Sequence, residues 1–213
     1  MTRALVLLAR VAIPGYGKTR LRQSLPDADV DALTRAFLHD TIEWSSQIEA
    51  DLIIVRAGPV DALPATEATL VPQVDGDLGA RIDAALSVAF DRGAEAAVLI
   101  GSDSPDLPER LLLACFAGLA DAETTLIPAA DGGWVALGAR RPLNGCLRSV
   151  CWSIGDTCTE TVAALRAAHR PPLVLDPWYD IDDVDSLDRL RESLENNPER
   201  APRTAQIVAH LLP

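Results

Sequence analysis

Apolar residues in this chain alternate between short continuous runs and longer stretches with helical spacing. Continuous apolar runs are typical of strands buried on both faces of a parallel sheet, and the stretches between them are typical of crossover helices. The runs predict strands at residues 4–9, 51–56, 96–101, 124–129, 134–139 and 172–176. Helical spacing occurs in residues 30–48, 78–90, 107–119, 157–168 and 185–194. The pattern predicts an α/β fold with a mostly parallel sheet flanked by helices.

The length of 213 residues is enough to bury one large core, and one domain is expected. Residues 195–203 are polar and include two prolines, which indicates a linker before a short C-terminal helix. We therefore expect one domain over residues 1–194, and a linker with a short helix over residues 195–213.

Composition narrows the class of protein. Hydrophobic residues make up 48% and charged residues 23%, as in ordinary globular proteins. No apolar run approaches the roughly 20 residues that span a bilayer, and the N-terminus resembles a buried strand more than a signal peptide, so we expect a cytoplasmic protein without a membrane partner. The net charge of -12 argues against a nucleic-acid surface. The four cysteines lack metal-ligand spacing and are expected to be free thiols.

A glycine-containing turn follows the first predicted strand, in the segment VAIPGYGKTRL. It ends like a phosphate-binding P-loop, but Ala12 replaces the first glycine of that motif and Pro14 removes one backbone donor. An ATPase is therefore the lesser alternative. Lys18, Arg20 and Arg22 are clustered in an otherwise acidic chain. Because cations at a helix start are disfavoured, this loop indicates a phosphorylated ligand rather than ordinary solvated charges.

An acidic loop, GSDSPDLP, follows the most apolar predicted strand. It places Asp103 at the carboxyl end of that strand, where ligands of open α/β sheets bind. A carboxylate there is a natural ligand of Mg²⁺, so we assign Asp103 to a metal. Asp106 is instead expected to cap the following helix.

A second acidic segment, WYDIDDVDSL, precedes the last long helix. In an extended chain Asp180 and Asp182 face the same way and are able to bind one cation together. Asp183 and Asp185 are expected at the helix start, as caps or partners of the helix dipole. The alternative is a solvated acidic turn.

Two further loops contain glycines. QVDGDLGAR ends on a predicted helix face that carries Arg81, and AADGGWVALG precedes a predicted strand. Each is either a tight turn or a place where the backbone approaches a base or sugar.

Six of these segments occur in an order that resembles one family. They are IPGYGKTRL, GDLGARI, VLIGSDSPDLP, DGGWVALGA, the pair Trp152-Ser153, and WYDIDDVDSL. The chain resembles a glycosyltransferase-like family of the nucleotide-diphospho-sugar transferase superfamily, of the radical-SAM and selenodomain-associated type. It is similar in organisation to phospholactate guanylyltransferase and to the molybdenum-cofactor guanylyltransferase. The resemblance extends to about residue 194 and implies a single GT-A-like, Rossmann-like domain.

The resemblance also implies roles for particular residues. Nucleotide contacts are expected from Ala9, Arg10, Gly15, Lys18, Arg20, Gln73, Gly76, Gly79 and Arg81. Mg²⁺ or Mn²⁺ is expected on Asp103, Asp180 and Asp182. The acceptor or sugar is expected beside Asp131, Gly132, Gly133, Trp134, Trp152 and Ser153. Lys18, Arg20 and Asp103 are the expected catalytic residues.

Two reactions fit these residues. Glycosyl transfer moves a sugar from a nucleotide diphospho-sugar to a small-molecule acceptor, whereas nucleotidyl transfer joins an NTP to a phosphorylated small molecule and releases pyrophosphate. Both need a divalent cation and basic side chains against the leaving group. Lys18 and Arg20 favour nucleotidyl transfer because a triphosphate carries more charge, and the family label favours glycosyl transfer, which we expect here. A non-catalytic nucleotide-binding module is the third alternative. No oligomeric state is predicted.

Overall fold

The computed structural model describes residues 1–11, 13–152 and 155–211. Within these residues seven strands form one sheet, in the order β3-β2-β1-β4-β6-β5-β7. The strands are β1 (Arg3–Arg10), β2 (Asp51–Ala57), β3 (Thr69–Pro72), β4 (Ala96–Ile100), β5 (Thr124–Pro128), β6 (Trp134–Ala139) and β7 (Pro172–Val174). Only β6 runs antiparallel to its neighbours, β4 and β5. The predicted α/β fold with a mostly parallel sheet is confirmed.

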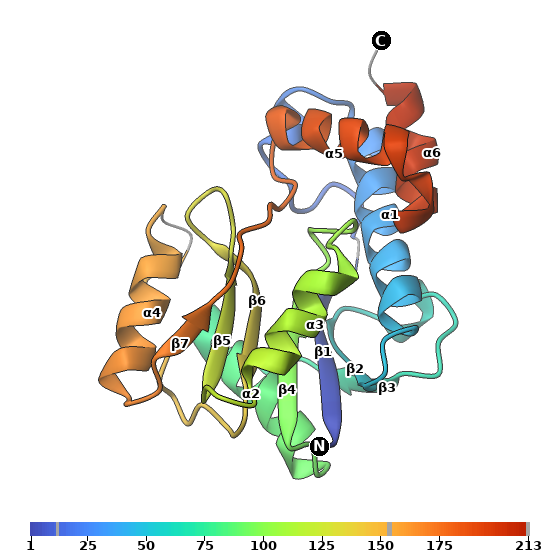
Figure 1. Cartoon of the computed structure of the whole chain (residues 1–213). Helices are drawn as coiled ribbons and strands as arrows, with labels where there is room; N and C mark the ends of the chain where they lie inside the picture. The colour runs from blue at the N-terminus through green and yellow to red at the C-terminus, as the bar shows by residue number, and fades with distance from the viewer. Residues whose placement is uncertain (12, 153–154, 212–213) are drawn as a thin grey trace.

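Helices cover both faces of this sheet (Figure 1). They are α1 (Asp27–Ser45), α2 (Leu78–Asp91), α3 (Glu109–Gly118), α4 (Thr157–Ala167), α5 (Val184–Asn196) and α6 (Pro202–Leu211). Short 3₁₀ turns lie at Leu21–Gln23, Val60–Ala62 and Pro198–Arg200. Helices α1 and α3 pack on one face, and α2 and α4 pack on the other. Among the described helices, none is long and apolar enough to cross a membrane.

The continuous apolar runs are explained by this double coverage. In β1, Leu5 and Leu7 pack into the cluster that contains α1 and α3. Ala4 and Val6, between them in sequence, pack into the cluster with α2 and α4. Because successive side chains of a strand point to opposite faces, a strand covered on both faces needs apolar residues at every position.

The strand β3 was not predicted from the sequence. It is a four-residue edge strand whose side chains are half-buried or exposed, so it lacks the continuous apolar run that marks the other strands. Edge strands pair on one side only, and pairing with β2 places this one. The strand carries the chain toward Gln73 at the carboxyl edge of the sheet.

A third apolar cluster lies beyond the carboxyl ends of the strands, where α5 and α6 lie beside α1 (Figure 1). It joins Val30 and Phe37 of α1 to Leu190 of α5 and Val208 of α6. Ile181, from the segment that leads into α5, is also fully buried in it. This cluster therefore holds the second acidic segment over the sheet edge. Residues 195–203 contain the end of α5, a 3₁₀ turn and the fully buried Ala201.

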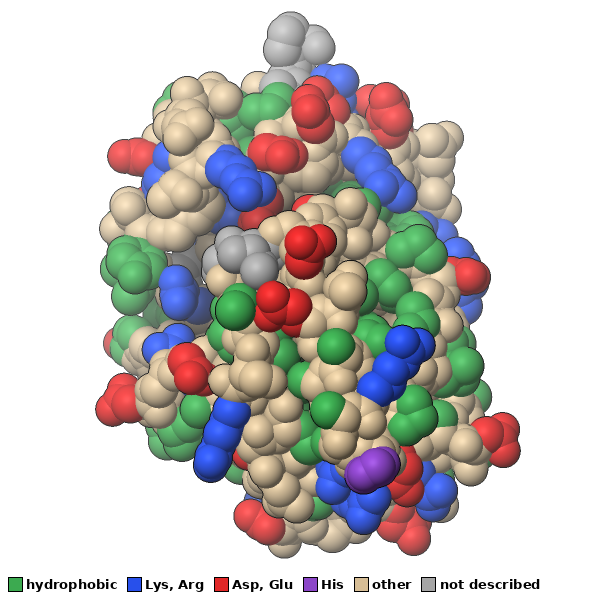
Figure 2. Space-filling view, turned by 90° about the vertical axis from the view of Figure 1, so that its left-hand side faces the viewer, with side chains coloured by type: hydrophobic (Ala, Val, Ile, Leu, Met, Phe, Trp, Pro, Cys, Tyr) green, Lys and Arg blue, Asp and Glu red, His purple; other side chains and the backbone are tan. Residues whose placement is uncertain are grey.

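The face of the molecule on which α4 lies outermost is shown in Figure 2. Acidic and basic side chains are interspersed there with apolar ones, and the described part of this face has no continuous basic area. The chain as a whole carries a formal net charge of -12.

Candidate active site

Two neighbouring cavities open at the carboxyl ends of β1 and β4. The first has a volume of about 340 Å³, and the second has a volume of about 440 Å³. Leu8, Leu78, Gly101, Asp103 and Asp182 line both cavities. Because β1 and β4 are paired in parallel, the basic loop after β1 and the acidic loop after β4 emerge side by side at this edge.

The first cavity gathers most of the side chains predicted for the nucleotide. Arg10, Lys18, Gln73 and Arg81 line it. The guanidinium of Arg10 lies 5.3 Å from the ring centroid of Tyr16, another lining residue. Three basic side chains face two carboxylates in this cavity, and that balance suits an anionic ligand.

Arg22 fixes the backbone of the loop after β1. Its guanidinium donates to the carbonyl oxygen of Gly17 at 2.8 Å and to that of Tyr16 at 3.2 Å. It also pairs with the carboxylates of Asp27 and Asp31 on α1. Arg22 belongs to the cluster of basic residues in the sequence that indicated a phosphorylated ligand, but these contacts turn its side chain toward the loop, so we assign it a structural role.

Lys18 lies between the two acidic loops. Its side chain is 7% exposed, and its ammonium is 3.0 Å from Asp103 Oδ1 and 2.8 Å from Asp182 Oδ1. Burial by itself would lower the pKa of Lys18, but the two carboxylates more than offset burial and leave the pKa raised. The ammonium is therefore charged and ties the loop after β1 to both acidic loops.

Three carboxylates converge beside this contact. Asp131, Asp180 and Asp182 each offer an oxygen within 4.8 Å of the others. Burial, followed by the negative charges of Asp131 and Asp182, raises the pKa of Asp180 to about 6. Crowded like charges of this kind are relieved by a cation, and an all-carboxylate donor set fits Mg²⁺ or Mn²⁺ better than Zn²⁺.

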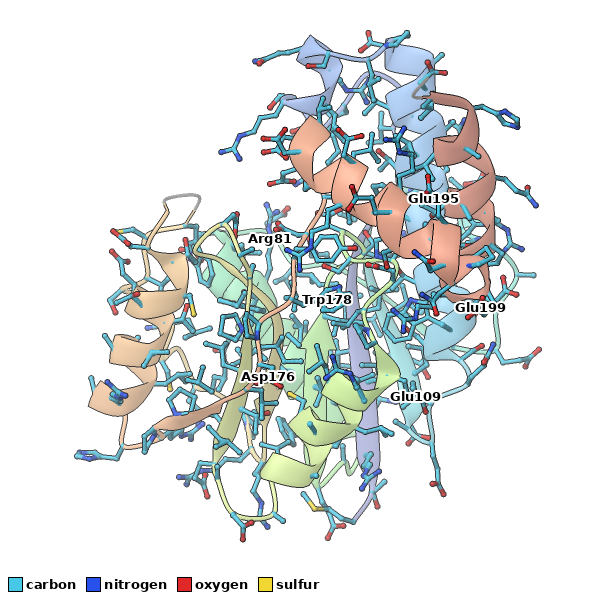
Figure 3. The ribbon with its side chains drawn as sticks, turned by 45° about the horizontal axis from the view of Figure 1, so that its top comes forward. Arg81, Glu109, Asp176, Trp178, Glu195 and Glu199 are labelled. Atoms are coloured by element: carbon cyan, nitrogen blue, oxygen red, sulfur yellow. The ribbon has the colours of Figure 1, made fainter. Side chains whose placement is uncertain are left out.

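The pairing of β5 with β7 brings these carboxylates together. An isolated bridge between Ala129 and Trp178 continues the parallel β5–β7 pairing past the ends of both strands. Trp178, labelled in Figure 3, lies in the segment between β7 and α5. The loop that holds Asp131 therefore lies beside the segment that holds Asp180 and Asp182.

The candidate metal ligands differ in one position from those predicted. Asp180 and Asp182 are joined in the cluster by Asp131, which was predicted to lie beside the acceptor or sugar. Asp103 pairs with Lys18 and lines the same cavity as the cluster. The position of Asp131 just after a buried strand was a signal for it, because that is where Asp103 also lies.

The second cavity combines acidic and aromatic walls. Asp103, Asp131, Asp180 and Asp182 line it, and Arg20 is the one basic side chain among its described lining residues. Trp134 and Trp152 form its aromatic wall, with ring centroids 6.4 Å apart and planes at 70°. Trp134 donates its indole N–H to Thr161 Oγ1 at 3.2 Å, which fixes the ring.

Most residues predicted for the acceptor or sugar line this second cavity, namely Asp131, Gly133, Trp134 and Trp152. Ser153 lies outside the described residues. Arg20, predicted for the nucleotide, also lines this cavity and not the first, so its predicted phosphate role remains a prediction.

The remaining predicted residues line neither cavity as the described residues define them: Ala9, Gly15, Gly76, Gly79 and Gly132. Ala9 is fully buried in the core. A Cβ on Gly132 would lie 1.7 Å from the carbonyl oxygen of Gly155, and one on Gly79 would lie 2.9 Å from that of Leu147. These two glycines permit close backbone packing beneath the second cavity.

Asp106 does not cap α3, contrary to the prediction. The N-cap position of α3 is Pro108, which makes no side-chain cap hydrogen bond. Asp106 is 1% exposed and accepts hydrogen bonds from Tyr179 Oη at 2.6 Å, Ser193 Oγ at 2.8 Å and Trp178 Nε1 at 3.3 Å. Burial and the Asp106 charge both raise the pKa of Tyr179. The carboxylate thus anchors the second acidic segment.

The start of α5 follows the prediction. Asp183 is its N-cap and forms a capping box with Ser186, whose hydroxyl accepts from the Asp183 backbone N–H. Asp185 lies in the first turn. With these two carboxylates used at the helix start, Asp180 and Asp182 are the pair that faces the cavities.

The sheet order, the basic loop after β1 and the acidic residues at the sheet edge define a GT-A-like domain of the nucleotide-dependent transferase class. The chain belongs to the family described as "Uncharacterized protein conserved in bacteria (DUF2064)", whose profile matches residues 40–154. No curated protein sequence matches it.

Solved structures share the fold. A protein from Desulfovibrio desulfuricans G20 assigned as a nucleotide-diphospho-sugar transferase has a TM-score of 0.89 and 28% identity, over 98% of this chain and 95% of its own. Rv0371c from Mycobacterium tuberculosis H37Rv, in complex with manganese, has a TM-score of 0.52 and 23% identity, over 91% and 100%. CMP:2-keto-3-deoxy-manno-octonic acid synthetase with CTP has a TM-score of 0.58 and 12% identity, over 92% and 99%. The last two similarities show the fold alone.

Proposed function

We propose that this protein is a divalent-metal-dependent transferase that binds a nucleotide diphospho-sugar and moves its glycosyl group to a small-molecule acceptor. The observation that carries the proposal is the contrast between two adjoining cavities. One is basic and the other is acidic and aromatic, and Asp103 and Asp182 lie on the wall between them.

The first cavity is assigned to the nucleotide and its diphosphate. Arg10 and Arg81 are available to bind phosphate oxygens, and Lys18 lies at the boundary with the acidic cluster. A cation on Asp131, Asp180 and Asp182 would supply further neutralisation of charge on the diphosphate leaving group. The basic side chains hold the diphosphate in place, so the bond to the sugar lies at the mouth of the second cavity.

The second cavity is assigned to the sugar and the acceptor. With a divalent cation on Asp131, Asp180 and Asp182, the remaining charges on its described lining are those of Asp103 and Arg20, which offset each other. The cavity then has no excess of basic side chains for a phosphorylated or carboxylated molecule. The indole faces of Trp134 and Trp152 suit the apolar face of a ring, and carboxylate oxygens accept hydrogen bonds from hydroxyl groups. This balance favours a neutral sugar there, and hence glycosyl transfer over transfer to a phosphorylated acceptor.

Nucleotidyl transfer is the second candidate, and one observation favours it. Lys18 lies on the loop that faces the first cavity, and a structural neighbour with the same fold binds CTP, a free triphosphate. In that reaction the acceptor would attack the α-phosphorus and pyrophosphate would leave. The residues that hold the nucleotide would be the same.

Matched ligands separate the two reactions. In a thermal-shift assay with Mn²⁺, we compare UDP with UDP-glucose, GDP with GDP-mannose, and the four NTPs. Ligand at 100 times its dissociation constant stabilises a protein by about 2.7 kcal/mol, which such an assay detects. Glycosyl transfer predicts that one nucleotide diphospho-sugar stabilises more than its own diphosphate. Stabilisation by NTPs without any such preference supports nucleotidyl transfer instead.

Two variants sharpen this comparison. Trp134→Ala is expected to weaken the binding of the sugar nucleotide about tenfold, because the sugar loses an aromatic side chain that packs against it. Binding of the plain diphosphate should stay unchanged. Arg81→Met is the matched contrast and should weaken both ligands equally. If Trp134→Ala weakened the plain diphosphate as much as the sugar nucleotide, the assignment of the second cavity to the sugar would be wrong.

Asp103→Asn distinguishes an enzyme from a non-catalytic nucleotide-binding module. A transferase loses metal-dependent turnover in this variant, measured as release of nucleoside diphosphate or pyrophosphate. A module that only binds nucleotide has no turnover to lose, and neither product would be released by the wild-type protein.

A further inference from the structure

Lys18 is the only lysine in the chain, and the other eighteen of its nineteen basic residues are arginines. Its ammonium lies against the carboxylates of Asp103 and Asp182, and its side chain is 7% exposed. Arginine presents a rigid planar fork of donors, whereas lysine presents a compact point charge on a flexible stem. The side chain at this position is therefore able to change partners with little movement of the backbone.

Asp182 belongs to two constellations. Its Oδ1 is 2.8 Å from the Lys18 ammonium, and its carboxylate is also one of the three that converge as candidate metal ligands. A divalent cation on this carboxylate would lie a few ångströms from the ammonium, where like charges repel strongly in a partly buried site. Lys18 and a metal ion are consequently competitors for the same negative charge.

We propose that Lys18 is an internal counter-ion of the acidic cluster, which a metal ion displaces toward the first cavity. This inference rests on the metal site of the proposed function. The first cavity is the natural destination, because Lys18 already lines it together with Arg10 and Arg81. Phosphate groups there give the displaced ammonium a new partner.

The backbone around Lys18 is suited to a side-chain exchange. Arg22 holds the carbonyl oxygens of Tyr16 and Gly17, so the loop is anchored just before Lys18. The Arg22 backbone N–H donates to the carbonyl oxygen of Lys18 at 3.0 Å, so the loop is also held at Lys18 itself. Rotation of the lysine stem is then the movement available.

The exchange couples metal and nucleotide. A metal that arrives alone takes Asp182 from Lys18 and leaves Asp103 as the carboxylate that still pairs with it, whereas a metal that arrives with phosphate also brings a new partner for the ammonium. Metal should therefore bind weakly by itself and more tightly with nucleotide, and by reciprocity nucleotide should bind more tightly with metal. Because of Lys18, metal and nucleotide should bind together more tightly than either binds alone.

The direct test uses Mn²⁺ alone, with binding measured by isothermal titration calorimetry. Lys18→Met, which keeps the stem and removes the charge, is expected to bind Mn²⁺ about tenfold more tightly than wild type. Lys18→Arg keeps the charge and should bind as weakly as wild type. Arg141→Met is the matched control for net charge, because Arg141 pairs with Glu123 at the exposed surface. Equal or weaker Mn²⁺ binding by Lys18→Met overturns the proposal.

A second measurement uses the unaltered protein. Because Lys18 is the only lysine, an amine-selective acetylating reagent has two targets, Lys18 and the N-terminal amine, and intact and peptide masses distinguish them. Lys18 should react more slowly than the N-terminus, and Mn²⁺ should accelerate its acetylation severalfold. Sodium chloride at equal ionic strength should not. Acetylation of Lys18 that is insensitive to Mn²⁺ at saturating concentration contradicts the displacement.

Failure of this inference is distinguishable from failure of the proposed function. If wild type and Lys18→Met bind Mn²⁺ equally and Asp180→Asn does not bind it, the metal site stands and the role of Lys18 is wrong. If none of the variants binds Mn²⁺, with or without nucleotide, both the metal site and the counter-ion role are wrong.

Discussion

At the scale of one residue, Asp180 is a carboxylate whose charge is disfavoured by its surroundings in the candidate site. Burial and the carboxylates of Asp131 and Asp182 raise its pKa to about 6, well above the usual value for an aspartate. The folded protein therefore binds this proton more tightly than the unfolded chain does. The stability that the proton contributes is complete below about pH 4 and is lost as the pH rises through about 6.

Asp180→Asn should therefore stabilise the protein at pH 7 in the absence of divalent metal. We expect a gain of about 1 kcal/mol in the free energy of unfolding, after allowance for solvent screening, and no gain at pH 4. Urea unfolding in EDTA at both pH values measures it. The same variant should lose the stabilisation that Mn²⁺ gives to wild type. A variant less stable than wild type at pH 7 would show that Asp180 is held by a favourable partner instead.

At the scale of elements, single side chains from α1 and its flanks hold the neighbouring segments. Arg22 fixes the loop after β1 by binding two of its carbonyl oxygens and two carboxylates of α1. Asp40 of α1, 1% exposed, accepts from the backbone N–H of Thr204 at 2.8 Å and from that of Arg203 at 3.2 Å. The loop that carries Lys18 and the first turn of α6 both depend on such contacts.

Arg22→Lys should weaken nucleotide binding about tenfold while the fold is retained, because an ammonium cannot replace the several simultaneous hydrogen bonds of a guanidinium. The thermal-shift titration with nucleotide measures the effect. Arg35→Lys is the control, since Arg35 lies exposed on α1, the helix whose Asp27 and Asp31 pair with Arg22. Unchanged nucleotide affinity in Arg22→Lys would mean that the loop keeps its conformation without the hydrogen bonds of the Arg22 guanidinium.

Asp40→Ala should lower the free energy of unfolding by about 2 kcal/mol, because it removes the acceptor for the first turn of α6 from a buried position. Glu43→Ala is the matched comparison. Glu43 also pairs with Arg203 but is half exposed, so its loss should cost less than about 0.5 kcal/mol. Chemical denaturation of both variants gives the two values, and equal costs would contradict a capping role for Asp40.

At the scale of the whole molecule, buried hydrogen bonds connect the third apolar cluster to the candidate active site. Asp106, at the carboxyl end of β4, is bound by Trp178 and Tyr179 from the second acidic segment and by Ser193 from α5. Ser104 Oγ donates to the carbonyl oxygen of Tyr179, and the Ile181 N–H donates to that of Asp103. These contacts tie the helices beyond the sheet to the loop that bears Asp103.

Asp106→Ala should cost roughly 3–5 kcal/mol of stability, because the buried Tyr179 hydroxyl and the partly buried donors of Trp178 and Ser193 lose their acceptor together. It should also weaken Mn²⁺ binding, although Asp106 is not a candidate ligand, since the segment with Asp180 and Asp182 loses its anchor. Tyr179→Phe removes one donor only and should cost about 1–1.5 kcal/mol. Chemical denaturation and Mn²⁺ titration of both variants test these expectations. Unchanged Mn²⁺ affinity in a folded Asp106→Ala would show that Asp106 does not position Asp180 and Asp182.

The sequence by itself determined the class of fold and the order of the loops. Continuous apolar runs such as 4–9 and 96–101 require strands with both faces covered, and parallel strands bring their following loops to one edge. These local rules were enough to place Lys18 and Asp103 at that edge. The short edge strand β3 escaped prediction because its position depends on pairing with β2 and not on burial.

Only the tertiary structure decided which side chains meet. Asp131 joins Asp180 and Asp182 because β7 pairs beside β5, a relation between segments about fifty residues apart. Arg22 turned to its own loop, and Asp106 to Tyr179, because partners within reach were supplied by distant elements. Spacing along the chain specifies which edge a residue reaches, but the contacts at that edge are set by strand order and helix packing, which no local pattern encodes.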